Sequence, residues 1–296
     1  MHLKIRITME NNKKWYLLFF LGCVWGSSFL LMKLGLKGVN PIQMGSLRIL
    51  FAAAFLVVVG FKHIAKIPLH KWKYIALTSM FGTFLPVYLF ATALSKIDGS
   101  VSSILNSLTP LFALLFGILF FKVDVQRRQI FGVIIGFVGC VLLILFGEGE
   151  NTTENYSYAL LVVLASVFYG INVNLIKKYL SDLKPLTIST GNFLIMLIPA
   201  LVILYFSDFF EIANEPKVMV SLGYIAILGI VGTGFSNILF FKLIQLSSPV
   251  FASSVTYLIP VVAILLGYFL MNETLSLIQG IGALVVLLGV YFSSKK

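Results

Sequence analysis

The chain has 296 residues, of which 59% are hydrophobic and only 11% are charged. Soluble domains contain about 25% charged residues, so this composition excludes a soluble globular protein. The net charge of +11 does not indicate nucleic-acid binding, because the basic residues lie in short segments between long apolar runs and not on one face of a domain. The sequence predicts a polytopic membrane protein with membrane lipids as partners and no nucleic-acid partner.

Apolar runs of about 20 residues, the length that crosses a bilayer as a helix, follow one another from Trp15 onward. The first run is too long for a signal-peptide h-region and is expected to remain as a span. The runs are continuously apolar, which favours helices over a barrel of alternating strands. The ten spans are expected at about 15–36, 42–61, 73–95, 100–121, 129–147, 157–176, 186–206, 219–241, 249–271 and 275–294.

The Lys and Arg residues predict the orientation of these spans. If both termini are cytoplasmic, 17 of the 22 Lys and Arg residues lie in cytoplasmic segments. Four lie outside, and Arg48 lies within a span. This is a strong positive-inside bias. We therefore predict a multi-pass protein of the plasma (inner) membrane with cytoplasmic N- and C-termini.

The two halves of the chain resemble each other. At an offset of 150 residues, Gly82-Thr83 recurs as Gly232-Thr233, and nearer the start an offset of 144 pairs Lys33 with Lys177. Further pairs at these offsets are Gly26/Gly170, Pro41/Pro185, Ser103/Ser253, Pro110/Pro260, Gln129/Gln279, Gly132/Gly282 and Gly139/Gly289. Each half holds five spans, an odd number, so the second half must enter the membrane from the opposite side. Secondary transporters share this plan, with the substrate site between the halves.

The predicted fold is therefore all-α, with ten transmembrane helices forming two inverted five-helix repeats. Residues 1–14 are expected to form a cytoplasmic tail and residues 15–147 the first repeat. Residues 148–156 are expected to form an extracytoplasmic linker and residues 157–294 the second repeat.

Polar and aromatic residues inside the spans are candidates for a substrate cavity. Helical spacing places Ser103 and Asn106 on one face of the fourth span, and the ninth span repeats that face with Thr256 and Tyr257. The serines fit helix packing equally well, whereas Asn106 and Tyr257 are costlier to bury unpaired. The candidates are Trp25, Ser28, Arg48, Tyr88, Ser103, Asn106, Tyr169, Asn172, Asn237, Thr256 and Tyr257.

Arg48 is the only basic residue deep inside a span. A charge at such depth is a functional hypothesis by default. Its partner could be Glu273 or Asp98 near the outer helix ends, a backbone carbonyl, or an anionic substrate group. A structural ion pair and a substrate contact remain equally open at this point, and so does snorkelling.

Three segments resemble the EamA-type drug/metabolite transporter superfamily: WGSSFLLMKLGL (25–36), PIQMGSLRILFAAAFL (41–56) and MNETLSLIQGIGALVVLLGVYF (271–292). The resemblance covers nearly the whole chain. It implies two five-helix halves and transport, most often export, of small metabolites such as amino acids. The halves differ, because Glu273 matches Val123, Trp25 matches Tyr169 and Arg48 matches Asn192. The site therefore need not be symmetric.

We accordingly expect a secondary transporter that works by alternating access around a central cavity. No P-loop is present, so ATP is not expected to drive it. The spans contain no histidine and no paired acids, which disfavours an intramembrane enzyme and a metal site, and no cofactor is expected. The alternative is a protein like a lipid-linked sugar flippase, or a non-transporting membrane partner. Substrate, direction, coupling ion and oligomeric state (monomer or homodimer) are left open.

Overall fold

The computed structural model describes residues 2–97, 99–145, 156–271 and 277–293. All regular structure within these ranges is helical. The elements are α1 His2–Gly35, α2 Pro41–Ile64, η1 Leu69–Lys71, α3 Trp72–Ser79, η2 Met80–Phe84, α4 Leu85–Leu94, α5 Gly99–Asn106, α6 Thr109–Phe121, α7 Arg127–Leu145, α8 Tyr156–Tyr179, α9 Pro185–Tyr205, α10 Phe209–Ile212, α11 Pro216–Ile227, η3 Leu228–Phe235, α12 Ser236–Leu246, α13 Pro249–Ser253, α14 Val255–Met271 and α15 Leu277–Ser293.

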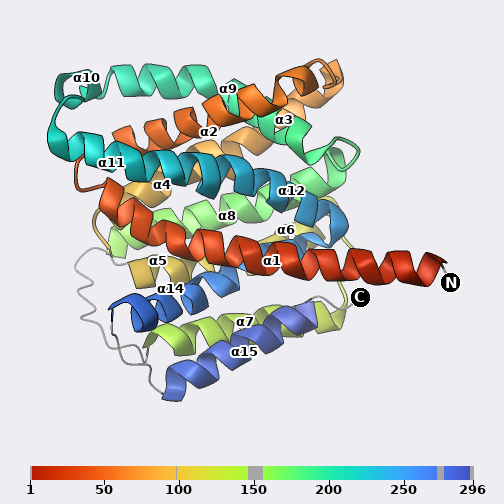
Figure 1. The fold of residues 1–296 in the computed structure, drawn as a ribbon. Helices are drawn as coiled ribbons and strands as arrows, with labels where there is room; N and C mark the ends of the chain where they lie inside the picture. Colours follow the sequence, from red (N-terminus) through yellow and green to blue (C-terminus); the bar gives the residue numbers. More distant parts are fainter. Residues whose placement is uncertain (1, 98, 146–155, 272–276, 294–296) are drawn as a thin grey trace.

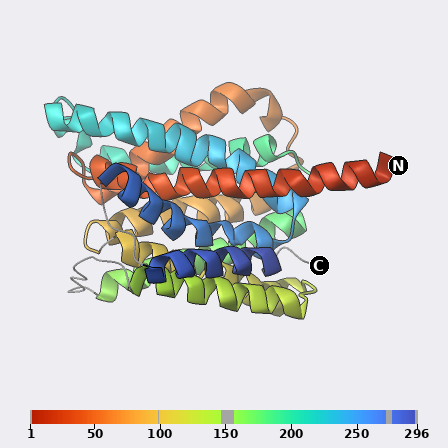
Figure 2. The same ribbon diagram turned by 60° about the horizontal axis from the view of Figure 1, so that its bottom comes forward.

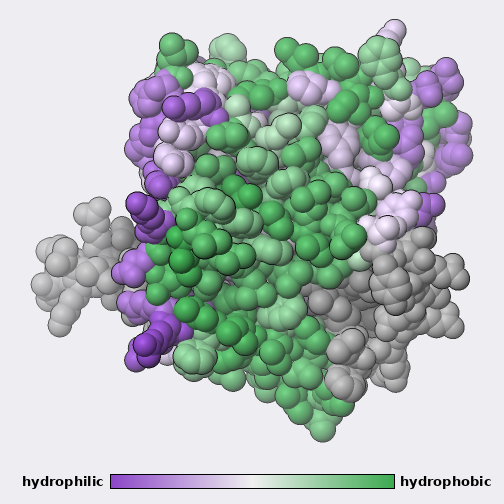
Figure 3. Space-filling view, turned by 180° about the vertical axis from the view of Figure 1, so that it is seen from behind, coloured by the Kyte–Doolittle hydropathy of each residue, from purple (hydrophilic) through white to green (hydrophobic). Residues whose placement is uncertain are grey.

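The helices lie side by side in one bundle (Figures 1 and 2). α1 begins and α15 ends at the same end of this bundle, which we call the terminal end, and the other is the opposite end. Helix α1 begins at His2, so the segment expected as a tail is helical from that residue. Figure 3 shows a broad apolar band on one face, with hydrophilic residues gathered at its two ends.

Within the described residues, six helical runs are long and apolar enough to cross a membrane. They are Asn12–Gly35, Pro41–Ile64, Leu69–Leu94, Ser157–Tyr179, Pro185–Tyr205 and Pro216–Leu246. At 1.5 Å per residue, a run of 21 residues or more reaches across a hydrocarbon core of about 30 Å. The protein is therefore an integral, multi-pass membrane protein.

The start of α2 shows how local sequence fixes a helix end. The Asn40 side chain accepts a hydrogen bond from the Gln43 amide, and the Gln43 side chain accepts one from the Asn40 amide, both at 2.9 Å. This capping box is followed by Pro41 at the first helical position, where a missing N–H costs nothing. Gln43 Nε2 also donates to the carbonyl of Ser207 at 2.7 Å, which ties α2 to the end of α9.

Two expected single helices are broken in the structure. The span expected at 100–121 divides into α5 and α6, and the span expected at 249–271 divides into α13 and α14. The first break lies directly before Pro110, which lacks the N–H that a continuous helix requires. The second break lies at Ser254, and Pro260 follows six residues later, inside α14. The carbonyl of Asn106, four residues before Pro110, accepts a hydrogen bond from Thr109 Oγ1 at 2.8 Å instead.

Two further runs contain π-helical segments that the sequence did not predict. η2 lies between α3 and α4, and η3 lies between α11 and α12. The offset of 150 residues places η2 onto residues 230–234, within η3. π-Helical segments occur frequently at functional sites, so this repeat-related pair marks the middle of the bundle for closer inspection.

Helix neighbours follow the internal repeat. α2 packs along its repeat counterpart α9, and α7 packs along its counterpart α15. α1 packs along α14, and their counterparts α8 and α6 pack together in the same way. A Cβ on Gly26 would lie 2.6 Å from Cβ of Val262, and one on Gly170 would lie 2.6 Å from Cβ of Phe112. These two contacts are related by the offsets of 144 and 150 residues. Equivalent glycines therefore allow the same close helix crossing in each half.

Candidate substrate cavity

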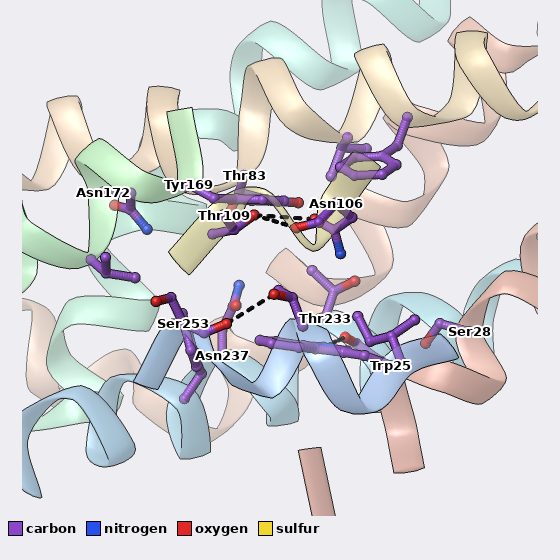
Figure 4. Close-up of a pocket in the computed structure, with 18 of the residues that line it drawn as sticks. Trp25, Ser28, Thr83, Asn106, Thr109, Tyr169, Asn172, Thr233, Asn237 and Ser253 are labelled. Atoms are coloured by element: carbon purple, nitrogen blue, oxygen red, sulfur yellow. Dashed lines mark hydrogen bonds between the residues drawn. The ribbon is translucent and has the colours of Figure 1, made fainter. Parts of the chain in front are cut away.

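A cavity lies in the middle of the bundle, between the two halves of the chain (Figure 4). The space open to the centres of water molecules is about 100 Å³, enough for several waters or one small solute. Its polar or hydrogen-bonding lining residues are Trp25, Ser28, Arg48, Thr83, Asn106, Thr109, Tyr169, Asn172, Thr233, Asn237, Ser253 and Thr256. Its apolar side chains are Phe29, Met32, Val87, Phe90, Val173, Phe240, Phe241 and Ile259.

Eight of the eleven candidate residues line this cavity. They are Trp25, Ser28, Arg48, Asn106, Tyr169, Asn172, Asn237 and Thr256. The lining comes from the first, third, fourth, sixth, eighth and ninth of the expected spans, with Arg48 of α2 in addition.

Three candidates do not line it. The Tyr257 side chain is fully buried against Gly136, and its hydroxyl donates to the carbonyl of Val133 in α7 at 2.8 Å. The Tyr88 hydroxyl instead shares a hydrogen bond of 2.9 Å with Ser46 Oγ. Ser103 is buried outside the lining. The spacing argument included too wide a face of the helix. Consecutive residues of an α-helix point about 100° apart, so Tyr257 does not share the direction of Thr256.

The sequence reasoning missed several lining residues, although the repeat contained the signal. The lining residues fall largely into repeat-related pairs, such as Phe90 with Phe240 and Asn106 with Thr256. Thr83 and Thr233 form another such pair, on η2 and η3. A cavity lined by equivalent residues from both halves lies where the pseudo-symmetry of the repeat places a central site.

The η3 side of the cavity carries the positive charge. Arg48 Nε donates to Thr233 Oγ1 at 2.7 Å, and Thr233 Oγ1 donates to the carbonyl of Leu228 at 3.1 Å. Trp25 Nε1 donates to the carbonyl of Gly232 at 3.0 Å. Helices α1 and α2 are thus fixed to consecutive residues of one π-helical segment, and the guanidinium is held at the cavity wall.

Arg48 has no carboxylate partner within the part of the chain that the structure describes. Its Nη1 lies 3.9 Å from the sulfur of Met32, a weak acceptor. Asp98 and Glu273, the partners considered from the sequence, lie outside the described residues. Among the described residues, the cavity lining contains no acidic side chain. A positive charge in such a low-dielectric cavity favours an anionic group as its ligand.

The η2 side is neutral and holds unpaired hydrogen-bonding atoms. Asn172 Oδ1 and Thr83 Oγ1 are buried and have no hydrogen-bond partner among the described residues. Asn172 packs over Gly82 as Ser28, its repeat counterpart, packs over Gly232. Arg48 has Asn192 as its counterpart, and that side chain is buried and accepts from Thr78 at 3.0 Å. The cavity is therefore pseudo-symmetric in shape but charged on one side only.

Aromatic rings form the remaining wall. Trp25 and Phe240 meet edge to face with ring centroids 5.0 Å apart, and Phe90 stacks on Tyr169 at 6.0 Å. Among the described residues no group of three or more His, Cys, Asp or Glu side chains could hold a metal ion. The arrangement suits a small organic ligand with one anionic group and an apolar part.

A charged contact at the terminal end joins the two halves beyond the cavity. Lys71 Nζ donates to Asp182 Oδ1 at 2.9 Å and to the carbonyl of Tyr179 at 2.7 Å. The hydrogen bond from Lys71 lowers the pKa of the Asp182 carboxyl below its ordinary value. The contact connects the α2–α3 segment to the α8–α9 loop.

Comparison with known sequences identifies the family. The EamA-like transporter family matches residues 13–145 and 156–295. The chain belongs to this family. As an EamA-like protein it is a membrane transporter, and the cavity between its halves is the candidate place for the transported solute.

Three similar proteins are named as transporters or as an efflux pump. An "Uncharacterized transporter" of Archaeoglobus fulgidus is 29% identical, with 96% of this chain and 99% of that protein covered. The "Uncharacterized inner membrane transporter YedA" of Escherichia coli is 27% identical, with 92% and 88% covered. The "Probable amino-acid metabolite efflux pump" of Salmonella typhimurium is 24% identical, with 96% and 95% covered.

A solved crystal structure shares the fold of this EamA-like chain. It superposes with a TM-score of 0.71 at 16% sequence identity and covers 94% of this chain and 95% of the other. At that identity the likeness concerns the fold alone.

Proposed function

We propose that this EamA-like protein is a secondary transporter that exports small carboxylate-bearing metabolites, with amino acids as the leading class. The ten spans form two inverted five-helix repeats, with both termini in the cytoplasm. The repeats open the central cavity alternately to either side of the membrane.

The guanidinium of Arg48 is the observation that carries the substrate class. It lines the cavity, it is held in place by Thr233, and no described carboxylate neutralises it. A buried arginine without an anion is costly. A substrate carboxylate would accept hydrogen bonds from the guanidinium in a charge-assisted pair, which is stronger than a neutral hydrogen bond.

The rest of the lining fits the other parts of an amino acid. The unpaired oxygens of Asn172 and Thr83 are acceptors that an ammonium group could use. The rings of Trp25, Phe90 and Phe240 provide an apolar wall for a side chain. The named amino-acid efflux relative supports both the substrate class and the direction, and the positive-inside distribution supports the orientation.

Transport in proteoliposomes tests this proposal. The purified chain is reconstituted into liposomes that contain a radiolabelled amino-acid mixture. Unlabelled amino acids or their carboxamides are then added outside, and the exchange is measured as release of the label. Carboxamides keep the size and the ammonium group but lose the negative charge. We expect exchange with at least one amino acid and weak or no exchange with its carboxamide. Equal exchange with both, or exchange with neither across the panel, would contradict the proposed substrate class.

A further inference from the structure

The internal repeat allows the two ends of the bundle to be compared residue by residue. α1 in the first half corresponds to α8 in the second, through the offset of 144 residues. The turn between α4 and α5 corresponds to the turn between α12 and α13, through the offset of 150 residues. The end of α1 and the α4–α5 turn lie at the opposite end (Figure 1). The end of α8 and the α12–α13 turn lie at the terminal end.

The terminal end is closed by a lysine in a ring of carbonyl oxygens. Lys177 Nζ donates to the carbonyls of Ile244 at 3.1 Å, Gln245 at 3.1 Å and Ser247 at 2.7 Å. Carbonyls at a helix C-terminus lack partners and carry partial negative charge, so they attract an ammonium. Gln245 Nε2 also donates to the carbonyl of Leu183 at 2.7 Å. These bonds hold α8 and its following loop against the α12–α13 turn.

The equivalent residues at the opposite end stand apart around an open pocket. The counterparts of these five residues are Lys33, Leu94, Ser95, Ile97 and Val39. All five line one pocket, whose space open to the centres of water molecules is about 600 Å³. Lys33 is exposed there and makes no hydrogen bond within the described ranges, and the Ser95 hydroxyl bonds locally to Thr92 at 2.8 Å. The same residue set is therefore closed at one end and open at the other.

We propose that Lys33 and Lys177 are paired gate lysines that are engaged in turn. When the opposite end closes, the Lys33 ammonium donates to the carbonyls of Leu94, Ser95 and Ile97. Lys177 makes the equivalent bonds to Ile244, Gln245 and Ser247 in this structure. When the terminal end opens, Lys177 leaves its carbonyls. This inference rests on the alternating access of the proposed function, in which only one end is open at a time. It assigns the structure to the state with the opposite end open.

The test measures the opening of the opposite end without any substrate. The full-length chain carries Cys23→Ser, because Cys23 is exposed whereas Cys140 is buried, and Ser95→Cys as a reporter in the pocket. The rate of reaction of this thiol with a bulky maleimide is followed in lipid nanodiscs, where both ends are accessible. Adding Lys177→Gln removes the terminal contact and should shift the population toward the state in which the opposite end is closed.

We expect Lys177→Gln to slow the labelling at least about threefold, because three charge-assisted hydrogen bonds no longer favour the present state. Adding Lys33→Gln to that chain should restore the rate to within about twofold, because the opposite end then loses its own lysine contact. The matched control is Lys37→Gln, which lines the same pocket but has Ser181 as its counterpart. It should not restore the rate.

Unchanged labelling in Lys177→Gln, or equal restoration by Lys37→Gln, would overturn the gate assignment. If Lys177→Gln does not fold, Gln245→Ala removes the bond to Leu183 at the same end and should slow labelling in the same direction; no slowing there overturns the assignment too. Amino-acid exchange with unchanged labelling would refute the gate lysines alone. The expected labelling without any exchange would refute the proposed substrate class alone.

Discussion

The glycine contact between α7 and α15 gives a stability prediction that can be worked out from distances. A Cβ on Gly289 would lie 2.3 Å from the backbone nitrogen and 2.4 Å from the Cα of Gly136. Ordinary van der Waals contact begins near 3.4 Å, so Gly289→Ala must separate the two helices by about 1 Å. A gap of about 0.5–1 Å already loses a quarter to a half of the dispersion energy of the separated atoms.

We therefore expect Gly289→Ala to lower the free energy of unfolding by about 1–3 kcal/mol, the usual cost of overpacking. The matched control is Gly280→Ala in the same helix, where a Cβ would meet no described atom within 4 Å. Alanine favours helix over glycine by up to about 1 kcal/mol, so the control should be neutral or slightly stabilising.

Thermal unfolding in detergent, followed by intrinsic fluorescence or scattering, measures both variants. For chains of about 150–250 residues, each kcal/mol shifts Tm by about 2–4 °C, so the two variants should differ by several degrees. Equal Tm values for Gly289→Ala and Gly280→Ala would refute the close backbone contact between α7 and α15.

Two other outcomes follow from the same structure. Tyr257→Phe removes the hydrogen bond to the Val133 carbonyl and should cost about 1 kcal/mol of stability. The KM for transport should stay within about twofold, because the Tyr257 hydroxyl faces α7. A large change in KM would show that Tyr257 belongs to the substrate site. Asp182→Asn should lower Tm slightly at pH 7, by the equivalent of at most about 1 kcal/mol, since the Asp182 side chain is 59% exposed. The Asp182 pKa is lowered in the folded state, so this difference should disappear as the pH falls below the ordinary value of 3.8. A difference that persists in acid would show that Lys71 does not bond the charged carboxylate.

The apolar runs and the repeat predicted much of the fold. Membrane character and helical structure followed from composition, because too few charged residues exist to cover a soluble surface. The breaks between α5 and α6 and between α13 and α14 did not follow, and neither did the two π-helical segments. Such local departures depend on which neighbouring groups satisfy the freed backbone atoms, and hydropathy contains no information on those partners.

The candidate site was predictable where a polar residue is unusual for its surroundings. Four such residues stand out because each must find partners within a bundle. They are Arg48, Asn106, Asn172 and Asn237, and all four line the cavity. Tyr257 was misplaced relative to the cavity because a tyrosine can satisfy its hydroxyl on a neighbouring helix, here α7. Hydropathy could not separate aromatic lining residues such as Phe240 from lipid-facing ones, although the repeat pairs Phe240 with Phe90.

The central claim is that Arg48 binds the carboxylate of the substrate. Transport of an amino acid and inhibition by its carboxamide, measured in proteoliposomes for the natural chain, Arg48→Gln and Lys37→Gln, test it most directly. A charge-assisted hydrogen bond contributes about 1.5–3 kcal/mol, so the natural chain and the Lys37→Gln control should prefer the carboxylate by about tenfold or more. Arg48→Gln should lose that preference while still folding. A preference for the carboxylate that Arg48→Gln leaves unchanged would contradict the account.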